Sequence, residues 1–127
     1  MRFHEDDRAQ RFCDIFPEAG GQTMVSRIRA PGHVVAWHRH KIQNDYWCCL
    51  QGSFKVGLAK ENGDFEFVYL SERNPRTIHI PPGIYHGYMA LEPNSILLYY
   101  MDQPYDPSDE YRAEVGHFGD EWSIPNK

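Results

Sequence analysis

The residues best suited to chemistry lie in residues 32–52, where the chain reads GHVVAWHRHKIQNDYWCCLQG. Residues two apart on a β-strand point to the same face, so His38 and His40 should share one face, with Asp45 reaching it across a turn. A third imidazole, His86, follows a proline-glycine turn in IPPGIYHGY. Imidazoles and a carboxylate around one point can transfer protons near neutral pH or bind a divalent metal ion.

The elements that would position these side chains are short β-strands. Segments of strand length that are rich in aromatic and β-branched residues are QTMVSRIR, HVVAWHRH, DYWCCL, SFKVGLA, DFEFVYL, RTIHI, YHGYMAL and SILLYYM. Turn signals separate them, which predicts an all-β fold: a small antiparallel jelly-roll barrel of roughly nine to eleven strands with little helix. The barrel core would span about residues 22–102, and residues 103–127 would form an irregular C-terminal tail that packs on it.

Length and charge limit the classes of protein that fit. A chain of 127 residues suits a single domain, residues 1–127, that buries roughly two-thirds of its unfolded surface. The net charge of −5 and the lack of a Lys/Arg cluster argue against nucleic acid as a partner. No apolar run approaches a membrane span and the N-terminus lacks an apolar secretory segment, which predicts a cytoplasmic protein with no membrane partner. Cys13, Cys48 and Cys49 are an odd number with two adjacent, so we expect no disulfide framework.

Two motifs resemble those of the cupin superfamily. The first cupin motif is Gly, five residues, His-x-His, three or four residues, Glu, six residues, Gly, and the chain follows it from Gly32 to Gly52 with Asp45 in place of Glu. The second, Pro-x-Gly, two residues, His, is matched from Pro81 to His86, although the usual leading Gly and trailing Asn are replaced. The resemblance implies a cupin barrel.

In metal-dependent cupins these motif positions bind a divalent ion. Carried over to this chain, the resemblance implies a site that suits Fe, Mn, Ni, Cu or Zn, with the ligands His38, His40, Asp45 and His86. Other cupins keep the same inner face as a metal-free polar pocket, in which hydrogen bonds satisfy the histidines. Both interpretations stay open at this point.

A longer stretch resembles the dTDP-4-dehydrorhamnose 3,5-epimerase family. The segment NPRTIHIPPGIYHGYMALEPNSILLYYMDQPYDPSDEYR contains that family's proline-rich turn, His-Gly-aromatic sequence, strand ending in Tyr and Tyr-Asp-Pro segment. DDRAQRFCDIF and FGDEWSIP loosely resemble its Asp-x-Arg-Gly-x-Phe stretch and its acidic, Trp-containing ending. The sequence HRHK also resembles the His-x-His-Lys of the related dTDP-sugar 3,4-ketoisomerases.

This resemblance implies an isomerase that needs no metal or other cofactor. Members remove a proton next to the ketone of a nucleotide-linked 4-keto-6-deoxy sugar and return one to the opposite face, which takes a base and an acid. The family's histidine base falls on His38, its supporting aspartate on Asp120, and its tyrosines on Tyr99 and Tyr105. An imidazole beside a carboxylate, and a phenol, suit these roles chemically. Tyr99 could instead be a core aromatic, Tyr105 a wall or lid of the pocket, and Asp120 a solvated acid.

Two positions depart from the family pattern. The arginine expected three residues before His38 is Val35 in this chain. Asp45 lies near the position of a family lysine when the chains are registered on Gly52. These departures leave open the sugar, the nucleotide and the carbon that is inverted.

Other residues are candidates for binding the substrate, a small molecule expected to be a dTDP-sugar. The candidates for the diphosphate, chosen for charge and bidentate geometry, are Arg8, Arg27 and Arg29, while Lys41 could contact a phosphate or stabilise an enolate. The candidates for the sugar or base are His40, His86 and Tyr88. The strands TMVSRIR and DFEFVYL would present long open edges, so we also expect a homodimer.

Three functions from different classes fit these observations. The leading hypothesis is a sugar-nucleotide epimerase or isomerase that abstracts a proton next to a ketone. The alternative is a metal-dependent cupin enzyme, such as a dioxygenase or isomerase, built on the three histidines and Asp45. The third is a non-catalytic cupin that binds a small molecule.

Overall fold

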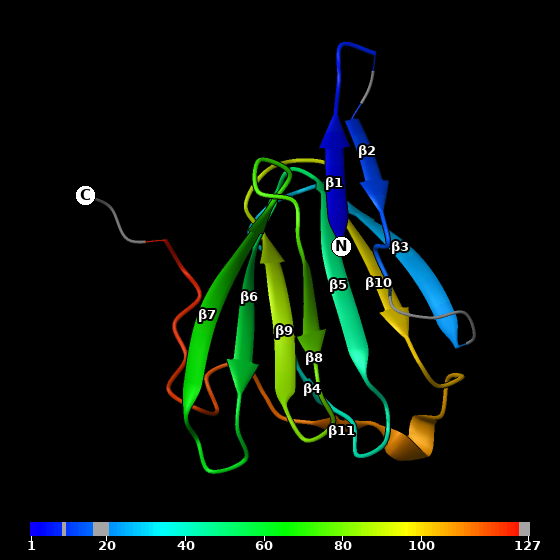
Figure 1. The fold of residues 1–127 in the computed structure, drawn as a ribbon. Helices are drawn as coiled ribbons and strands as arrows, with labels where there is room; N and C mark the ends of the chain where they lie inside the picture. The colour runs from blue at the N-terminus through cyan, green and yellow to red at the C-terminus, as the bar shows by residue number, and fades with distance from the viewer. Residues whose placement is uncertain (9, 17–20, 125–127) are drawn as a thin grey trace.

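The computed structural model describes residues 1–8, 10–16 and 21–124. This part of the chain forms eleven β-strands and a short 3-10 helix, η1 (Pro107–Asp109), and contains no α-helix (Figure 1). The strands are β1 (Arg2–Glu5), β2 (Gln10–Cys13), β3 (Gln22–Ile28), β4 (Val34–Arg39), β5 (Asp45–Gln51), β6 (Ser53–Ala59), β7 (Phe65–Ser71), β8 (Thr77–Ile80), β9 (Tyr85–Ala90), β10 (Ser95–Met101) and β11 (Tyr111–Arg112). The predictions of an all-β fold and of roughly nine to eleven strands are confirmed. No helix in the described ranges is long and apolar enough to cross a membrane.

Two antiparallel sheets make the body of the fold (Figure 1). One has the strand order β3-β10-β5-β8 and the other β11-β4-β9-β6-β7, while β1 and β2 form a separate hairpin. Strands distant in sequence lie side by side, as the jelly-roll prediction requires. The sheets do not close into a barrel, which corrects that part of the prediction. Among the described strands β7 pairs only with β6 and β8 only with β5, so no ladder joins β7 to β8.

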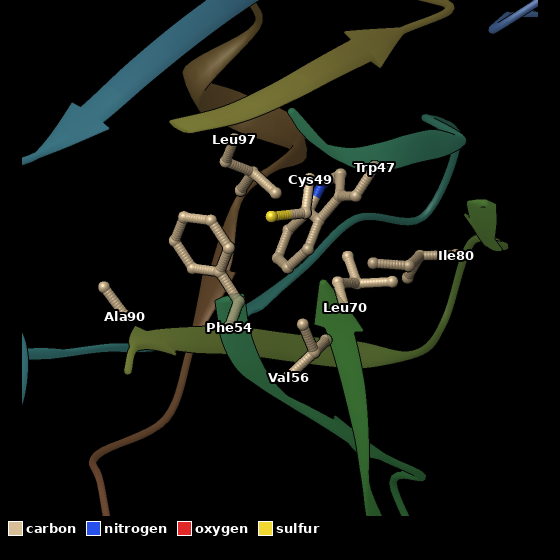
Figure 2. Packing of buried hydrophobic residues seen from close by; sticks show 8 residues of the cluster. All are labelled: Trp47, Cys49, Phe54, Val56, Leu70, Ile80, Ala90 and Leu97. Carbon is tan, nitrogen blue, oxygen red and sulfur yellow. The ribbon is translucent and has the colours of Figure 1, made fainter. Parts of the chain in front are cut away.

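The main core lies between these two sheets, because alternate residues of each strand point inward. Figure 2 shows how side chains from both sheets meet in the buried cluster of Trp47, Cys49, Phe54, Val56, Leu70, Ile80, Ala90 and Leu97. Burying each of the larger apolar side chains contributes on the order of 1.5–3 kcal/mol. The strands that carry the candidate histidines are therefore held by a continuous apolar interior.

The C-terminal tail packs on the outer face of the sheet that contains β4. Trp122 lies against Trp37, with ring centroids 5.4 Å apart, in a second apolar cluster. The buried Lys55 ammonium donates to two carbonyl oxygens of the tail at 3.1 and 3.3 Å. Trp37 and Ala113 exchange two backbone hydrogen bonds, which extend the pairing of β11 with β4. The tail packs on the sheets as expected, and its last residues, 125–127, lie outside the described residues.

The pairing of β4 with β9 and β11 fixes the place of the first candidate histidine. His38 lies opposite His86 on one side and opposite Arg112 on the other. Arg39 points away from the core, where its guanidinium lies about 5 Å from two tyrosine rings, those of Tyr85 and Tyr111. His38 is therefore directed to the inner face.

Candidate active site

A cavity of about 250 Å³ is lined by residues of both sheets and of the segment that joins β10 to β11. In Figure 1, β11 lies at the lower end of the fold. The lining residues that carry polar chemistry are His38, His40, Gln43, Asp45, His86, Tyr88, Tyr99, Tyr105, Asp106 and Glu110. The prediction that His38 and His40 share an inner face with Asp45 and His86 is confirmed. The cavity gathers imidazoles, phenols and carboxylates, which are the groups needed for acid–base chemistry.

His38 is held by a carboxylate from the C-terminal tail. Its ring Nδ1 lies 3.1 Å from Oε1 of Glu110, the residue between η1 and β11. An ionised carboxylate accepts hydrogen bonds only, so Nδ1 carries the proton in this contact. The neutral ring then keeps its lone pair on Nε2, and this side chain lines the cavity.

The electrostatic surroundings favour the neutral form of His38. Burial lowers the pKa of His38 below its usual 6.5, and the charges of His86 and Arg112 lower that pKa further. The hydrogen bond and negative charge of Glu110 act in the opposite direction but do not reverse the shift. His38 is therefore available as a proton acceptor at neutral pH.

Asp120, the aspartate expected to support His38, has a different place. Its Oδ2 accepts hydrogen bonds from the Gly116 backbone N–H and the Trp122 indole, both at 2.8 Å, and its Oδ1 accepts from the Phe118 backbone N–H at 3.1 Å. These bonds close a turn within the tail on the outer face of the sheet. The predicted pairing is thus corrected: the carboxylate against His38 is Glu110.

Three tyrosines line the cavity: the two catalytic candidates, Tyr99 and Tyr105, and the binding candidate Tyr88. The Tyr99 hydroxyl lies 3.1 Å from Ser26 Oγ, so the phenol is fixed in position while its ring lines the cavity. Burial, and then the neighbouring Tyr99, raise the pKa of Tyr88, which keeps that phenol protonated. Tyr105 is 73% exposed and lies at the rim, where it can act as a wall or lid.

His40, Asp45 and His86 form the densest polar group in the cavity. One potential ligand atom from each lies within 4.8 Å of the others, a spacing that could hold a metal ion. His86 Nε2 lies 3.2 Å from Asp45 Oδ2, and His86 Nδ1 lies 3.1 Å from the carbonyl oxygen of Ile84. His38 lines the same cavity but is not part of this group of three, so the structure brings together three of the four residues expected as metal ligands.

Comparison with known proteins places the chain in a family. A family model described as dTDP-4-dehydrorhamnose 3,5-epimerase matches residues 21–122, which include every strand of the two facing sheets. The chain belongs to the dTDP-4-dehydrorhamnose 3,5-epimerase family. Epimerases of this family work without a cofactor, so the alternative of a metal-dependent cupin enzyme is not favoured.

Individual relatives agree with this family assignment. The spore coat polysaccharide biosynthesis protein SpsL of Bacillus subtilis is 34% identical over an alignment that covers 86% of this chain and 81% of that protein. The low-salt glycan biosynthesis epimerase Agl13 of Haloferax volcanii, described as probable, is 35% identical over 76% of this chain and 64% of its own length. A structure of the dTDP-4-dehydrorhamnose 3,5-epimerase of Bacillus anthracis has the same fold, with a TM-score of 0.84 at 20% identity over 98% of this chain and 83% of that one.

The two departures from the epimerase family pattern both lie in the cavity. Val35, in place of the family arginine, is among the lining residues, and so is Asp45, near the position of the family lysine. No Lys or Arg belongs to the lining formed by the described residues. The phenol hydroxyls of Tyr88, Tyr99 and Tyr105 are among the lining groups that can donate a hydrogen bond to a developing negative charge.

The four basic residues expected to contact the diphosphate do not line the cavity within one chain. Arg8 is in the turn after β1, where it pairs with Asp6 at 2.8 Å. Arg27 and Arg29 are exposed, because they alternate along the chain with Ser26 and Ile28, which face inward. Lys41 is also exposed, and its ammonium lies over the Tyr111 ring. Strand alternation explains the outward position of Arg27 and Arg29. The role of the four residues as diphosphate contacts stays a prediction.

Glu110, which lines the cavity, and Asp109, which supports it from η1, were not singled out from the sequence. Glu110 contacts His38, and Asp109 holds the loop between β4 and β5. Both lie in the part of the chain expected to be an irregular tail. Their contacts join residues 68 to 72 positions apart, and neither periodicity nor a motif spacing encodes such a contact.

Proposed function

We propose that this protein is a sugar-nucleotide epimerase that acts on a 4-keto-6-deoxy sugar by removing a proton from a carbon next to the ketone. The observation that supports it best is the His38–Glu110 contact, which leaves a basic Nε2 on a side chain of the cavity. The family assignment supports the same reaction class.

The proposed reaction needs only groups already in the cavity. Nε2 of His38 takes the proton from the carbon next to the ketone, and the C–H electron pair becomes a C=C bond as the ketone oxygen becomes an enolate. The hydroxyl of Tyr99 then donates its proton to the opposite face of the same carbon, which restores the ketone in the inverted configuration. Solvent afterwards returns a proton to Tyr99 and removes one from His38.

The nucleotide of the proposed substrate is deoxythymidine diphosphate. The Bacillus anthracis epimerase, which has the same fold, was solved with TDP and pyrophosphate bound. The proposal is tested by incubating the protein with a dTDP-4-keto-6-deoxy sugar and identifying the product by NMR coupling constants. Inversion at a carbon next to the ketone is expected; a substrate that remains unchanged relative to a protein-free sample would contradict the proposal.

The pH dependence of the reaction should follow the pKa of His38. Because this pKa lies below 6.5, the acid limb of kcat/KM should also lie below pH 6.5. Glu110 raises the pKa of His38, so Glu110→Gln should move the limb to lower pH and also slow the reaction, though less than loss of the base itself. Arg112 lowers that pKa, so Arg112→Gln is the matched control and should move the limb to higher pH. If the acid limb of kcat/KM stays at the same pH in both variants, a group other than His38 sets the pH dependence.

We further propose that the protein is a homodimer that pairs through β3. Among the described strands of one chain, β3 pairs only with β10, and Val25 is 61% exposed on this edge strand. Unpaired strand edges of this kind are normally covered. Sedimentation velocity at micromolar concentration should give the dimer mass, and Val25→Lys should shift it to monomer. A wild-type protein that sediments only as monomer would rule out the dimer.

We propose that the enzyme works in the cytoplasm. The three cysteines, Cys13, Cys48 and Cys49, are all free thiols in the structure. Proteins with free thiols and no disulfide suit a reducing compartment. Fractionation of cells that express the protein tests this location.

A further inference from the structure

The backbone of the loop between β4 and β5 is hydrogen-bonded to one buried aspartate of η1, Asp109. Asp109 Oδ1 accepts a hydrogen bond from the backbone N–H of Lys41 at 2.8 Å, and its Oδ2 accepts from the backbone N–H groups of Ile42 at 3.2 Å and Gln43 at 3.3 Å. Asp109 is 8% exposed. Three successive N–H groups that converge on one carboxylate fix the path of the loop.

The main chain of the same residue also contacts a histidine of the cavity. The carbonyl oxygen of Asp109 lies 2.8 Å from Nδ1 of His40. A carbonyl oxygen can only accept, so Nδ1 of His40 carries the proton, and in this tautomer Nε2 is the hydrogen-bond acceptor. Asp109 thus sets the tautomer of His40 as Glu110, the next residue, sets that of His38.

The loop that Asp109 holds is connected to the rest of the cavity. Gln43, whose backbone is bound by Asp109, donates from its side chain to Asp45 Oδ1 at 2.6 Å, and Asp45 in turn lies against His86. A shift of the loop would therefore move three groups that line the cavity. Burial alone would raise the pKa of Asp109, but the hydrogen bonds from the loop outweigh it and lower that pKa, so this carboxyl stays ionised at neutral pH.

We infer that Asp109 is a positioning residue that presents His40 Nε2 to the cavity as an acceptor for a hydroxyl group of the sugar. This inference rests on the proposed function for the identity of the ligand. The control of the His40 tautomer by Asp109 is a property of the free protein, so it can be measured without substrate turnover.

The test uses Asp109→Asn in the full chain, with Ser108→Ala as the matched control. Asn replaces one acceptor oxygen by an N–H₂ group that faces N–H donors, so the loop should shift. Ser108 belongs to the same helix, but within the described residues its hydroxyl donates to Asp106 and not to the loop. Long-range ¹H–¹⁵N NMR of the histidine rings should show the Nδ1–H tautomer of His40 in the wild type and in Ser108→Ala, and a mixture of tautomers in Asp109→Asn. A wild type in which His40 carries its proton on Nε2 would overturn the inference.

The kinetic part of the test separates positioning from general damage. Loss of one hydrogen bond to a sugar hydroxyl should raise KM for the keto-sugar nucleotide by about tenfold in Asp109→Asn, with a smaller change in kcat and unchanged affinity for dTDP alone. His40→Phe removes the acceptor and leaves the three hydrogen bonds between the loop and the Asp109 carboxylate in place, so it should give the same KM effect. This variant keeps the inference testable if Asp109→Asn does not fold. An unchanged KM in His40→Phe would overturn the role of His40. If no keto-sugar nucleotide is turned over at all, the proposed function fails while the tautomer measurement still decides the role of Asp109.

Discussion

Replacing His38 by Asn is expected to slow proton removal from the keto sugar by roughly 10²–10⁴-fold, the usual contribution of a general base. Asn has a similar size and can still bond to Glu110, but it has no lone pair basic enough to accept a proton from carbon. The cavity should keep its shape, so dTDP should bind with nearly unchanged affinity. The measurement is the rate of solvent deuterium uptake into the sugar, together with calorimetric titration of dTDP.

The matched control for this substitution is His33→Asn. His33 is exposed before β4 and does not line the cavity, so its loss should leave the uptake rate unchanged. Full deuterium uptake in His38→Asn would show that a different group is the base. A parallel loss in His33→Asn would show instead that the effect is not specific to the cavity.

Replacing Tyr99 by Phe is expected to separate the two halves of the reaction. The variant keeps the ring but loses the hydroxyl that lies against Ser26, so no proton can be returned from that side. Formation of the inverted product should fall by roughly 10²–10⁴-fold, as expected for loss of a general acid. Deuterium should still enter the sugar, because His38 can remove a proton and return one to the same face.

Tyr69→Phe serves as the control, because Tyr69 is on the outer edge strand β7 and half exposed. NMR follows product formation and deuterium uptake in the same sample. Loss of both signals in Tyr99→Phe would assign the phenol to binding or proton removal. Retention of both would assign the acid role to another donor of the cavity, such as Tyr88.

The fold and the inner face of the site were predictable because local patterns encode them. Strand alternation placed His38 and His40 on one face, and the motif spacing brought Asp45 and His86 to them. The same alternation decides that Tyr99 lines the cavity while Tyr100 points to the other face of the sheet, where it is buried and stacks on Phe16.

Local sequence patterns could not predict that the two sheets stay open, or that Glu110 is the carboxylate that contacts His38. Whether β7 pairs with β8 depends on how the two sheets face each other, which no single segment encodes. The choice between Glu110 and Asp120 depends on the path of a tail with no regular period. Two backbone hydrogen bonds between Trp37 and Ala113, and the packing of Trp122, fix that path and bring Glu110 to His38.

The most direct test of the proposed chemistry is the deuterium content of a dTDP-4-keto-6-deoxy sugar after incubation with the wild-type protein in D₂O. Proton removal next to the ketone exchanges that hydrogen whatever the final product. We expect mass spectrometry and NMR to show protein-dependent deuterium at a ring carbon next to the ketone, and none with His38→Asn. A wild-type protein that binds dTDP yet gives no deuterium above the protein-free rate would contradict the assignment of this protein as an epimerase.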